Sequence, residues 1–206
     1  MWLKLKPVLF LISLLPLARW IYLYSAQQLG QDPGLWLMSS SGQTTLSFLI
    51  ITLCMTPLRQ LTKQQGFILW RRMFGLFTFF YATCHLLLWS GMERHFSFAL
   101  MGKDIVERPA IVFGLFNYVL LCILAITSNQ AMVRKLGRNW RRLHRLVYIV
   151  AVFAVIHAIF MQRSDASIAD IYAFTAVVFI LLVWRIVAQR IQQQRIQQQL
   201  QAIKPK

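Results

Sequence analysis

The chain has 206 residues, of which 58% are hydrophobic and only 14% are charged, and its mean hydropathy is +0.55. A composition this apolar excludes an ordinary soluble domain. The formal net charge of +16 would suit nucleic-acid binding in a soluble protein, but no polar stretch is long enough to fold as a groove-reading domain. We therefore expect a polytopic membrane protein that contacts lipid and does not bind nucleic acid.

Apolar stretches of near-spanning length recur six times along the chain, and a bilayer requires about 20 apolar residues per helix. They lie at about residues 8–25, 44–58, 73–92, 109–128, 146–162 and 168–186. The first is expected to be a retained helix and not a signal peptide, because it lacks a clear small-residue cleavage site and five more spans follow it. The pattern predicts an all-α bundle of six transmembrane helices, forming one domain over residues 1–206.

The charges are distributed unevenly between the two sides of this bundle. If the N-terminus is cytoplasmic, the inner segments carry most of the lysines and arginines and none of the acids. The six acids all fall in the outer loops: Asp32, Glu93, Asp104, Glu107, Asp165 and Asp170. Only Arg94, Lys103, Arg108 and Arg163 accompany them. This positive-inside pattern predicts that both termini are cytoplasmic.

Helix one carries Arg19 in its outer half. A guanidinium at that depth must find an anion or reach water. It could pair with an anionic group of a cofactor, such as a haem propionate, or its side chain could snorkel to the interface. The loop that follows, at about residues 26–43, contains Gly, Pro and Ser but no basic residue, as expected of an exported connector. Trp36 in this loop is expected at the headgroup level.

Helices three and five each carry a histidine inside the span, where an ionisable side chain needs a partner. His85 follows Arg72 by thirteen residues, and His157 follows His144 by the same number. Thirteen residues of helix rise about 20 Å, and both helices run outward from the cytoplasm. We therefore expect His85 and His157 to lie at similar depth in the outer half of the membrane, where two facing imidazoles could bind one metal.

Several metals accept imidazole, but no thiolate pair or carboxylate lies near this histidine pair in the sequence. Two histidines facing an apolar cavity between helices suit haem b. The alternative is that each histidine only hydrogen-bonds a neighbouring helix, in which case the protein would be a non-redox membrane anchor or scaffold. His95 falls in an outer loop and is expected to be solvated.

His144 lies at the cytoplasmic interface, next to several arginines, and it is level with Arg72 on helix three instead of with another histidine. It could be a further haem ligand or a snorkelling interfacial residue. Arg72 could bind a haem propionate or a flavin phosphate, because its fork pairs with such oxyanions. Trp140 could stack on a cofactor ring, although an aromatic belt also accounts for it.

The chain ends in a tail, residues 187–206, that contains RIQQQ twice. Gln and Arg favour a helix that continues the last span into the cytoplasm. The three cysteines, Cys54, Cys84 and Cys122, all fall within spans and are expected to be packing residues.

Four segments of the sequence resemble a known family. They are SGQTTLSFLIITLCMTPLR, RRMFGLFTFFYATCHLLLW, GKDIVERPAIVFGL and LAITSNQAMVRKLGRNWRRLHRLVYIVAVFAVIH. They are similar to the MsrQ family, formerly YedZ, which is part of the ferric-reductase-like transmembrane group. The similarity covers nearly all of residues 7–186.

This resemblance implies a haem b subunit of the bacterial inner membrane. It further implies electron transfer from the quinone pool or a cytoplasmic flavin reductase to MsrP, a periplasmic molybdopterin enzyme that reduces methionine sulfoxide in oxidised envelope proteins. The substrate chemistry would lie in that partner, and FMN is implied as a further cofactor. His85, His144 and His157 match the family's haem-linked histidines. The wider group usually has a second histidine pair, whereas this chain has Arg72 at the fourth position.

Overall fold

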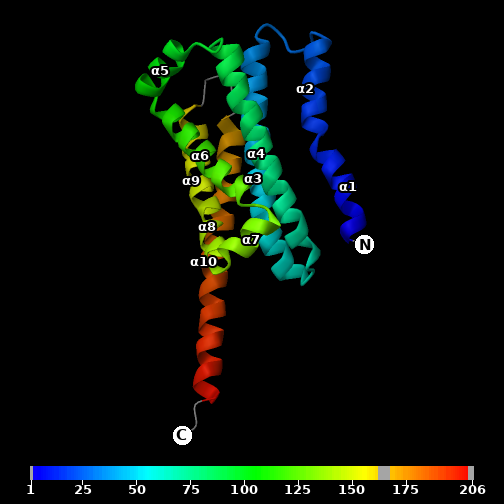
Figure 1. Ribbon diagram of the computed structural model, residues 1–206, viewed down its shortest axis with the longest axis vertical. Coiled ribbons are helices and arrows are strands. Elements are labelled where there is room, and N and C mark those ends of the chain that lie inside the picture. Colours follow the sequence, from blue (N-terminus) through cyan, green and yellow to red (C-terminus); the bar gives the residue numbers. More distant parts are fainter. Residues whose placement is uncertain (1, 162–167, 204–206) are drawn as a thin grey trace.

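The computed structural model describes residues 2–161 and 168–203, and those residues form helices without any strand. Six helical segments are long and apolar enough to cross a membrane, which confirms the predicted all-α, six-span bundle (Figure 1). The helices are α1 Trp2–Ser13, α2 Leu15–Ser25, α3 Pro33–Thr62, α4 Gly66–Leu88, the π-helical turn η1 Trp89–Glu93, α5 Phe98–Glu107, α6 Pro109–Ile126, α7 Gln130–Leu136, α8 Arg138–Leu143, α9 Leu146–Phe160 and α10 Ile168–Ile203.

The first span is two helices that meet at Leu14. Pro16 follows the break, and because proline has no N–H it cannot continue the hydrogen-bond ladder of α1. Tyr81 of α4 is completely buried and donates its hydroxyl proton to the Ser13 carbonyl at 2.6 Å. A broken helix is tolerated in a membrane when a neighbouring group satisfies the freed backbone in this way.

The second span is longer than expected, because α3 begins at Pro33 and not near residue 44. Asp32 caps the helix by accepting a hydrogen bond from the Leu35 backbone N–H at 2.9 Å, and proline suits the first helical position. Most of the expected outer loop is therefore helical, and Trp36 lies on α3. Hydropathy misses this segment because it is rich in serine and glycine, although Ser41 is buried inside the bundle.

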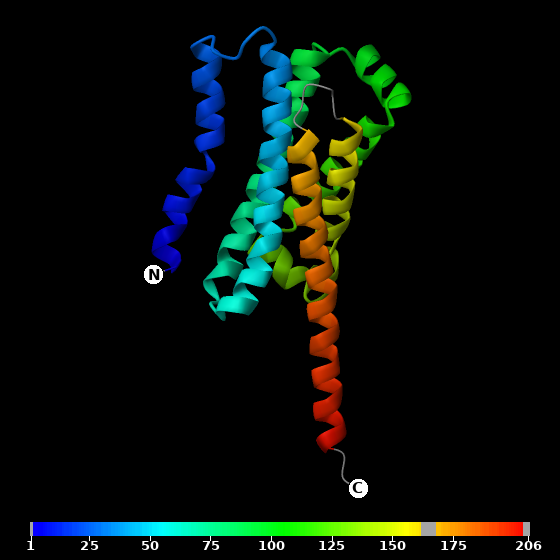
Figure 2. The ribbon, with the colours of Figure 1, turned by 180° about the vertical axis from the view of Figure 1, so that it is seen from behind.

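Helices α3 and α4 form an antiparallel pair held by aromatic side chains, and they lie side by side in Figures 1 and 2. Phe48 of α3 stacks on Tyr81 and Phe77 of α4, with ring centroids 5.1 and 5.6 Å apart. Helices α6 and α9 pack together beside them. Val150 and Ala151 of α9 are almost fully buried in the core that these four helices share with α10.

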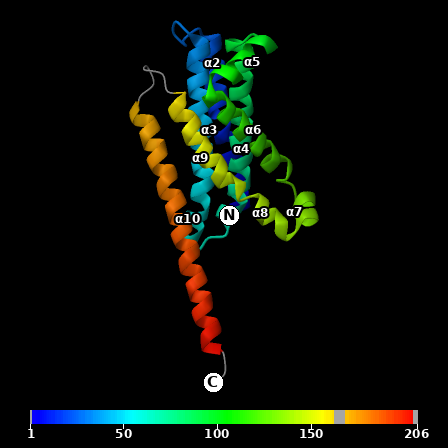
Figure 3. The same cartoon turned by 90° about the vertical axis from the view of Figure 1, so that its left-hand side faces the viewer.

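The connections contain short helices that the hydropathy pattern did not predict. Helix α5 lies in the outer segment 93–108. The Ser97 side chain caps its first turn by accepting a hydrogen bond from the Leu100 backbone N–H. Two further helices, α7 and α8, lie between α6 and α9. The sixth span continues without interruption into the tail as far as Ile203, so α10 extends well beyond the bundle (Figure 3).

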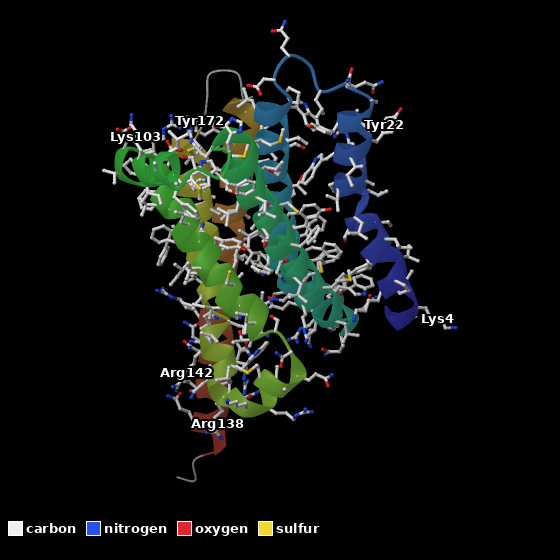
Figure 4. All side chains as sticks on the ribbon, turned by 45° about the horizontal axis from the view of Figure 1, so that its top comes forward. Lys4, Tyr22, Lys103, Arg138, Arg142 and Tyr172 are labelled. Atoms are coloured by element: carbon white, nitrogen blue, oxygen red, sulfur yellow. The ribbon has the colours of Figure 1, made fainter. Side chains whose placement is uncertain are left out.

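The two ends of the bundle differ in charge. Lys103 lies at the end that carries α5, whereas Arg138 and Arg142 lie at the opposite end (Figure 4). We call these the acidic end, which contains the described acids Asp32, Glu93, Asp104, Glu107 and Asp170, and the basic end, toward which both termini point (Figure 1). Arg163, Asp165, Lys204 and Lys206 lie outside the described residues.

Candidate functional site

His85 lies on α4 inside the bundle, where a serine of α3 contacts its ring. Nδ1 of His85 is 2.9 Å from Ser41 Oγ, and that hydroxyl donates its proton to the Met38 carbonyl at 3.0 Å. A hydroxyl has one proton to give, so the His85 Nδ1–H donates to Ser41. This arrangement fixes the tautomer and leaves a free lone pair on Nε2. A side chain at Gly42 would stand 3.3 Å from Cε1 of the ring, so the imidazole lies directly against α3.

His157 lies on α9 and is held by the backbone of α6. Its Nδ1 is 2.7 Å from the Ala110 carbonyl oxygen, which can only accept, so Nδ1 carries the proton and Nε2 is free. A Cβ at Gly114 would stand 2.8 Å from Cε1 of the ring, closer than real Cβ atoms approach. Helix α6 can therefore reach the histidine only because residue 114 has no side chain.

The two imidazoles face each other, as their matched depth predicts. Their ring centroids are 6.3 Å apart and the ring planes are nearly perpendicular, at 86°. Imidazole–metal bonds of about 2.0–2.1 Å, with about 1.1 Å from nitrogen to ring centroid, would separate two opposed imidazoles by about 6.3 Å. Ligating histidines commonly donate the other ring N–H to a backbone carbonyl or a polar group, as both do here. The separation of the rings and the free Nε2 atoms would therefore allow the two histidines to hold one metal between them.

A cavity of about 540 Å³ surrounds the histidine pair. Its walls are mostly apolar and come from α3, α4, α6, α9 and α10, with Leu46, Leu49, Leu121, Val150 and Phe174 among them. A volume in this range suits a cofactor-sized ligand. Its rim at the acidic end is polar, with Asp32, Gln43, Glu93 and Arg108. The cavity therefore offers an apolar interior for a ring system and a polar edge for charged substituents.

Two buried polar atoms of the cavity lining have no hydrogen-bond partner among the described residues. They are the indole Nε1 of Trp89 and the side-chain oxygen of Asn117. Trp89 opens the π-helical turn η1 one turn beyond His85, and such turns are frequent at functional sites. Orphaned buried polar atoms are costly without a ligand. The histidine pair, the apolar cavity and the unpaired indole N–H of Trp89 fit haem, which has an apolar ring and two carboxylates that accept hydrogen bonds.

Arg19 lies near this site without lining it. Its guanidinium carbon is 5.6 Å from the centroid of the Trp36 ring, and Trp36 lines the cavity. The Arg19 side chain is exposed at the membrane-facing surface. Arg108, which the sequence alone did not single out, is the arginine that lines the cavity itself.

His144 is in a different environment, at the basic end. Its Nε2 is 3.1 Å from Thr127 Oγ1, and its ring stacks on Trp140 with centroids 4.0 Å apart. The Trp140 indole N–H donates to the Thr127 carbonyl at 2.9 Å. Arg71 and Arg72 lie close enough to interact electrostatically with His144. The structure therefore places Arg72, Trp140 and His144 together, with no second histidine opposite His144 among the described residues.

Sequence reasoning missed the residues that hold the two rings, which are Ser41, Gly42, Ala110 and Gly114. A glycine within an apolar helix costs helix propensity, so Gly114 between Pro109 and Ile126 carried a usable signal of close helix approach. The Ala110 carbonyl carried no signal, because every residue has one. Trp89 also carried no signal, because aromatic residues are common near the membrane interface.

A family model, described as Ferric reductase like transmembrane component, matches residues 41–155. Three relatives carry the name protein-methionine-sulfoxide reductase heme-binding subunit MsrQ. The relative from Bordetella pertussis is 40% identical over 182 residues, covering 88% of each chain. The one from Polaromonas naphthalenivorans is 38% identical, covering 87% of this chain and 83% of its own. The one from Ralstonia nicotianae is 40% identical, covering 85% and 84%.

The matched segment includes Ser41 and His85 and ends two residues before His157. Taken with the six-span bundle, these matches identify the chain as a member of the MsrQ family of ferric reductase like transmembrane proteins.

Proposed function

We propose that this protein binds haem b between His85 and His157 and carries electrons across the membrane to a periplasmic methionine sulfoxide reductase of the MsrP type. The observation that carries the proposal is the 6.3 Å separation of the two imidazole centroids inside a cavity of cofactor size. The name of the relatives, protein-methionine-sulfoxide reductase heme-binding subunit, supports both the cofactor and the system.

The chain's own residues would bind, orient and shield the cofactor. His85 and His157 present free Nε2 lone pairs because Ser41 and Ala110 hold the opposite ring nitrogens. Haem supplies reversible one-electron chemistry when bound, and ligand identity and burial set its potential. The leucines and Val150 of the cavity lining would exclude water from the cofactor. Trp89 and Arg108 would donate hydrogen bonds to its carboxylates at the acidic rim.

We assign the acidic end to the periplasm and the basic end to the cytoplasm of the bacterial inner membrane, on the positive-inside pattern. The electron donor would be a quinone in the bilayer or a cytoplasmic flavin reductase, with FMN as a further cofactor. The acceptor would meet the acidic end, where the polar rim of the cavity lies. Acidic groups there can orient a partner as it docks.

The proposal does not include a second haem held by a histidine pair at His144. No second histidine lies opposite His144 among the described residues, and Arg72, which stays protonated, has no lone pair with which to ligate iron. We therefore assign His144, Trp140 and Arg72 to the donor side of the pathway, either at a second cofactor or at the contact with the electron donor.

The test is the visible spectrum and haem content of the purified protein and its histidine variants. We expect a Soret band that shifts on addition of dithionite. His85→Ala and His157→Ala should each lose most of the haem, whereas His144→Ala should keep the haem between the other two. His95→Ala, in the outer loop, is the matched control and should match the wild type. Equal haem content in the wild type and all four variants would refute the ligand assignment.

The competing possibility is a non-redox anchor for the periplasmic partner. It predicts a purified protein that still binds the partner but has no dithionite-sensitive Soret band, even after incubation with haem. The same measurement therefore separates the two functions.

A further inference from the structure

A second polar cluster lies between α3, α4, α9 and α10 at the basic end, away from the histidine pair. Tyr148 is at its centre. Arg71, Tyr148 and Arg185 line the same small depression, and the guanidinium carbon of Arg185 lies 5.7 Å from the centroid of the Tyr148 ring. Thr56 and Gln60 of α3 also line this depression. Two arginines from different helices are thus held against one tyrosine.

This cluster has no anion among the residues that the structure describes. The four ion pairs within residues 2–161 and 168–203 all join residues between Glu93 and Arg108, at the acidic end. Arg59 and Arg185 both repel Arg71 electrostatically. In addition, Nε of Arg185 is buried and has no hydrogen-bond partner there. Adjacent cations that are partly removed from water are costly unless an anion joins them.

The polar groups of the cluster are mostly donors. The side-chain oxygen of Gln60 accepts from the Trp184 indole N–H at 3.4 Å, which leaves the Gln60 amide NH₂ free to donate. Together with two guanidinium forks, this arrangement favours an oxyanion with several acceptor oxygens. Arginine forks match phosphate geometry closely. The ligand class that fits is therefore a phosphate group.

The position of the cluster indicates where that phosphate comes from. Helix α10 lies at the periphery of the bundle (Figure 3), and Val183, Trp184 and Val187 are between 41% and 48% exposed on its apolar surface. Such a surface contacts acyl chains at the depth where the two arginines meet the headgroups. Basic pockets between transmembrane helices on the cytoplasmic side bind anionic headgroups.

We propose that Arg71 and Arg185 bind the phosphate of an anionic phospholipid, with its acyl chains along α10 beside Trp184. The lipid would supply the missing counter-charge and connect α10 to α3 and α4. Each arginine near a headgroup contributes about fivefold in affinity, so loss of both should weaken binding about 30-fold. The proposal does not depend on haem binding.

The experiment uses the full chain, delipidated in detergent and titrated with phosphatidylglycerol or phosphatidylcholine, with bound lipid counted by native mass spectrometry. The wild type should retain one tightly bound phosphatidylglycerol and no equivalent phosphatidylcholine. Arg71→Gln/Arg185→Gln should lose that lipid. Arg195→Gln, an exposed arginine further along α10, is the control and should keep it. Arg71→Lys/Arg185→Lys keeps the charge without the forks and should bind with intermediate affinity, provided that helicity matches the wild type.

Two results would overturn the proposal. One is equal retention of phosphatidylglycerol by the wild type, the double glutamine variant and the double lysine variant. The other is binding of riboflavin 5′-phosphate or inorganic phosphate that depends on the two arginines while phosphatidylglycerol binding does not. That second result would reassign the cluster to a soluble phosphate ligand. Failure of either kind leaves the haem spectrum unaffected, so it is distinguishable from failure of the proposed electron-transfer function.

Discussion

His85 and His157 show how single atoms around a side chain determine its chemistry. Both rings are neutral donors at Nδ1, one to a serine hydroxyl and one to a backbone carbonyl, and both keep Nε2 free. Their sequence positions predicted a common depth because each lies thirteen residues from a residue at the basic interface. The tautomers were not predictable, because Ser41 and Ala110 come from helices that only the tertiary fold places alongside the rings.

Gly114 gives the sharpest prediction at this scale. In Gly114→Ala the new methyl group would stand 2.8 Å from Cε1 and 3.0 Å from Nδ1 of His157. The His157 ring must move away from α6, because the new methyl group is fixed to the helix backbone. This shift displaces Nε2 from its ligating position. Perturbing such a supporting contact typically costs 10- to 100-fold in metal affinity, so we expect haem affinity to fall by about that factor. Haem titration followed by the Soret band measures it.

The matched control is Gly102→Ala on α5, where the added methyl would meet no atom within 4 Å. Its haem affinity should equal that of the wild type. Unchanged haem affinity in Gly114→Ala would contradict the assignment of His157 as a ligand held against α6.

At the scale of elements, the departures from the predicted helices have local causes. Pro16 divides the first span, and Asp32 with Pro33 starts α3 well before the apolar run begins. The cap and proline were visible in the sequence, but hydropathy outweighed them because the serines that follow look solvated. Ser41 is buried instead, because His85 of α4 packs against it, and the extra turns of α3 are what bring Ser41 and Gly42 to His85.

Tyr81 of α4 contacts the break between α1 and α2. Removal of its hydroxyl should lower the free energy of unfolding. Tyr81→Phe deletes the donor to the Ser13 carbonyl at the break between α1 and α2 and leaves that carbonyl unsatisfied. We expect the free energy of unfolding to fall by about 0.5–1.5 kcal/mol. Unfolding in mixed detergent followed by circular dichroism gives this value. Tyr24→Phe, at an exposed tyrosine of α2, should have no effect, and equal losses in both variants would argue against the contact.

At the scale of the whole molecule, the acidic end and the basic end differ in charge and in the polar groups that they contain. The acidic end contains the polar rim of the cavity, and the basic end contains His144 and the arginine cluster around Tyr148. The proposed haem would lie nearer the acidic end, which would suit the proposed delivery of electrons to a partner on that side. The long α10 joins both ends and extends beyond the basic end into the tail (Figure 2).

The orientation of this whole assembly is testable with reporter fusions. Alkaline phosphatase inserted after Gln28, between α2 and α3, should be active because we expect that loop to be periplasmic. The same enzyme inserted after Gln64, between α3 and α4, should be inactive, and a fluorescent protein joined to the C-terminus should fluoresce. The reverse pattern would show that the bundle has the opposite orientation in the membrane. That orientation would exclude the proposed route to a periplasmic acceptor.

The sequence by itself determined the helical class, the six spans, the asymmetry of charge and the equal depth of His85 and His157. These follow from properties that act locally: the apolar length that a bilayer demands, the cost of moving charges across it and the fixed rise of a helix. Only the tertiary structure decided how closely the rings face each other, which atoms hold them, and that Arg71 and Arg185 share Tyr148. Those features depend on contacts between residues far apart in the chain, and no local pattern specifies which faces of the helices meet.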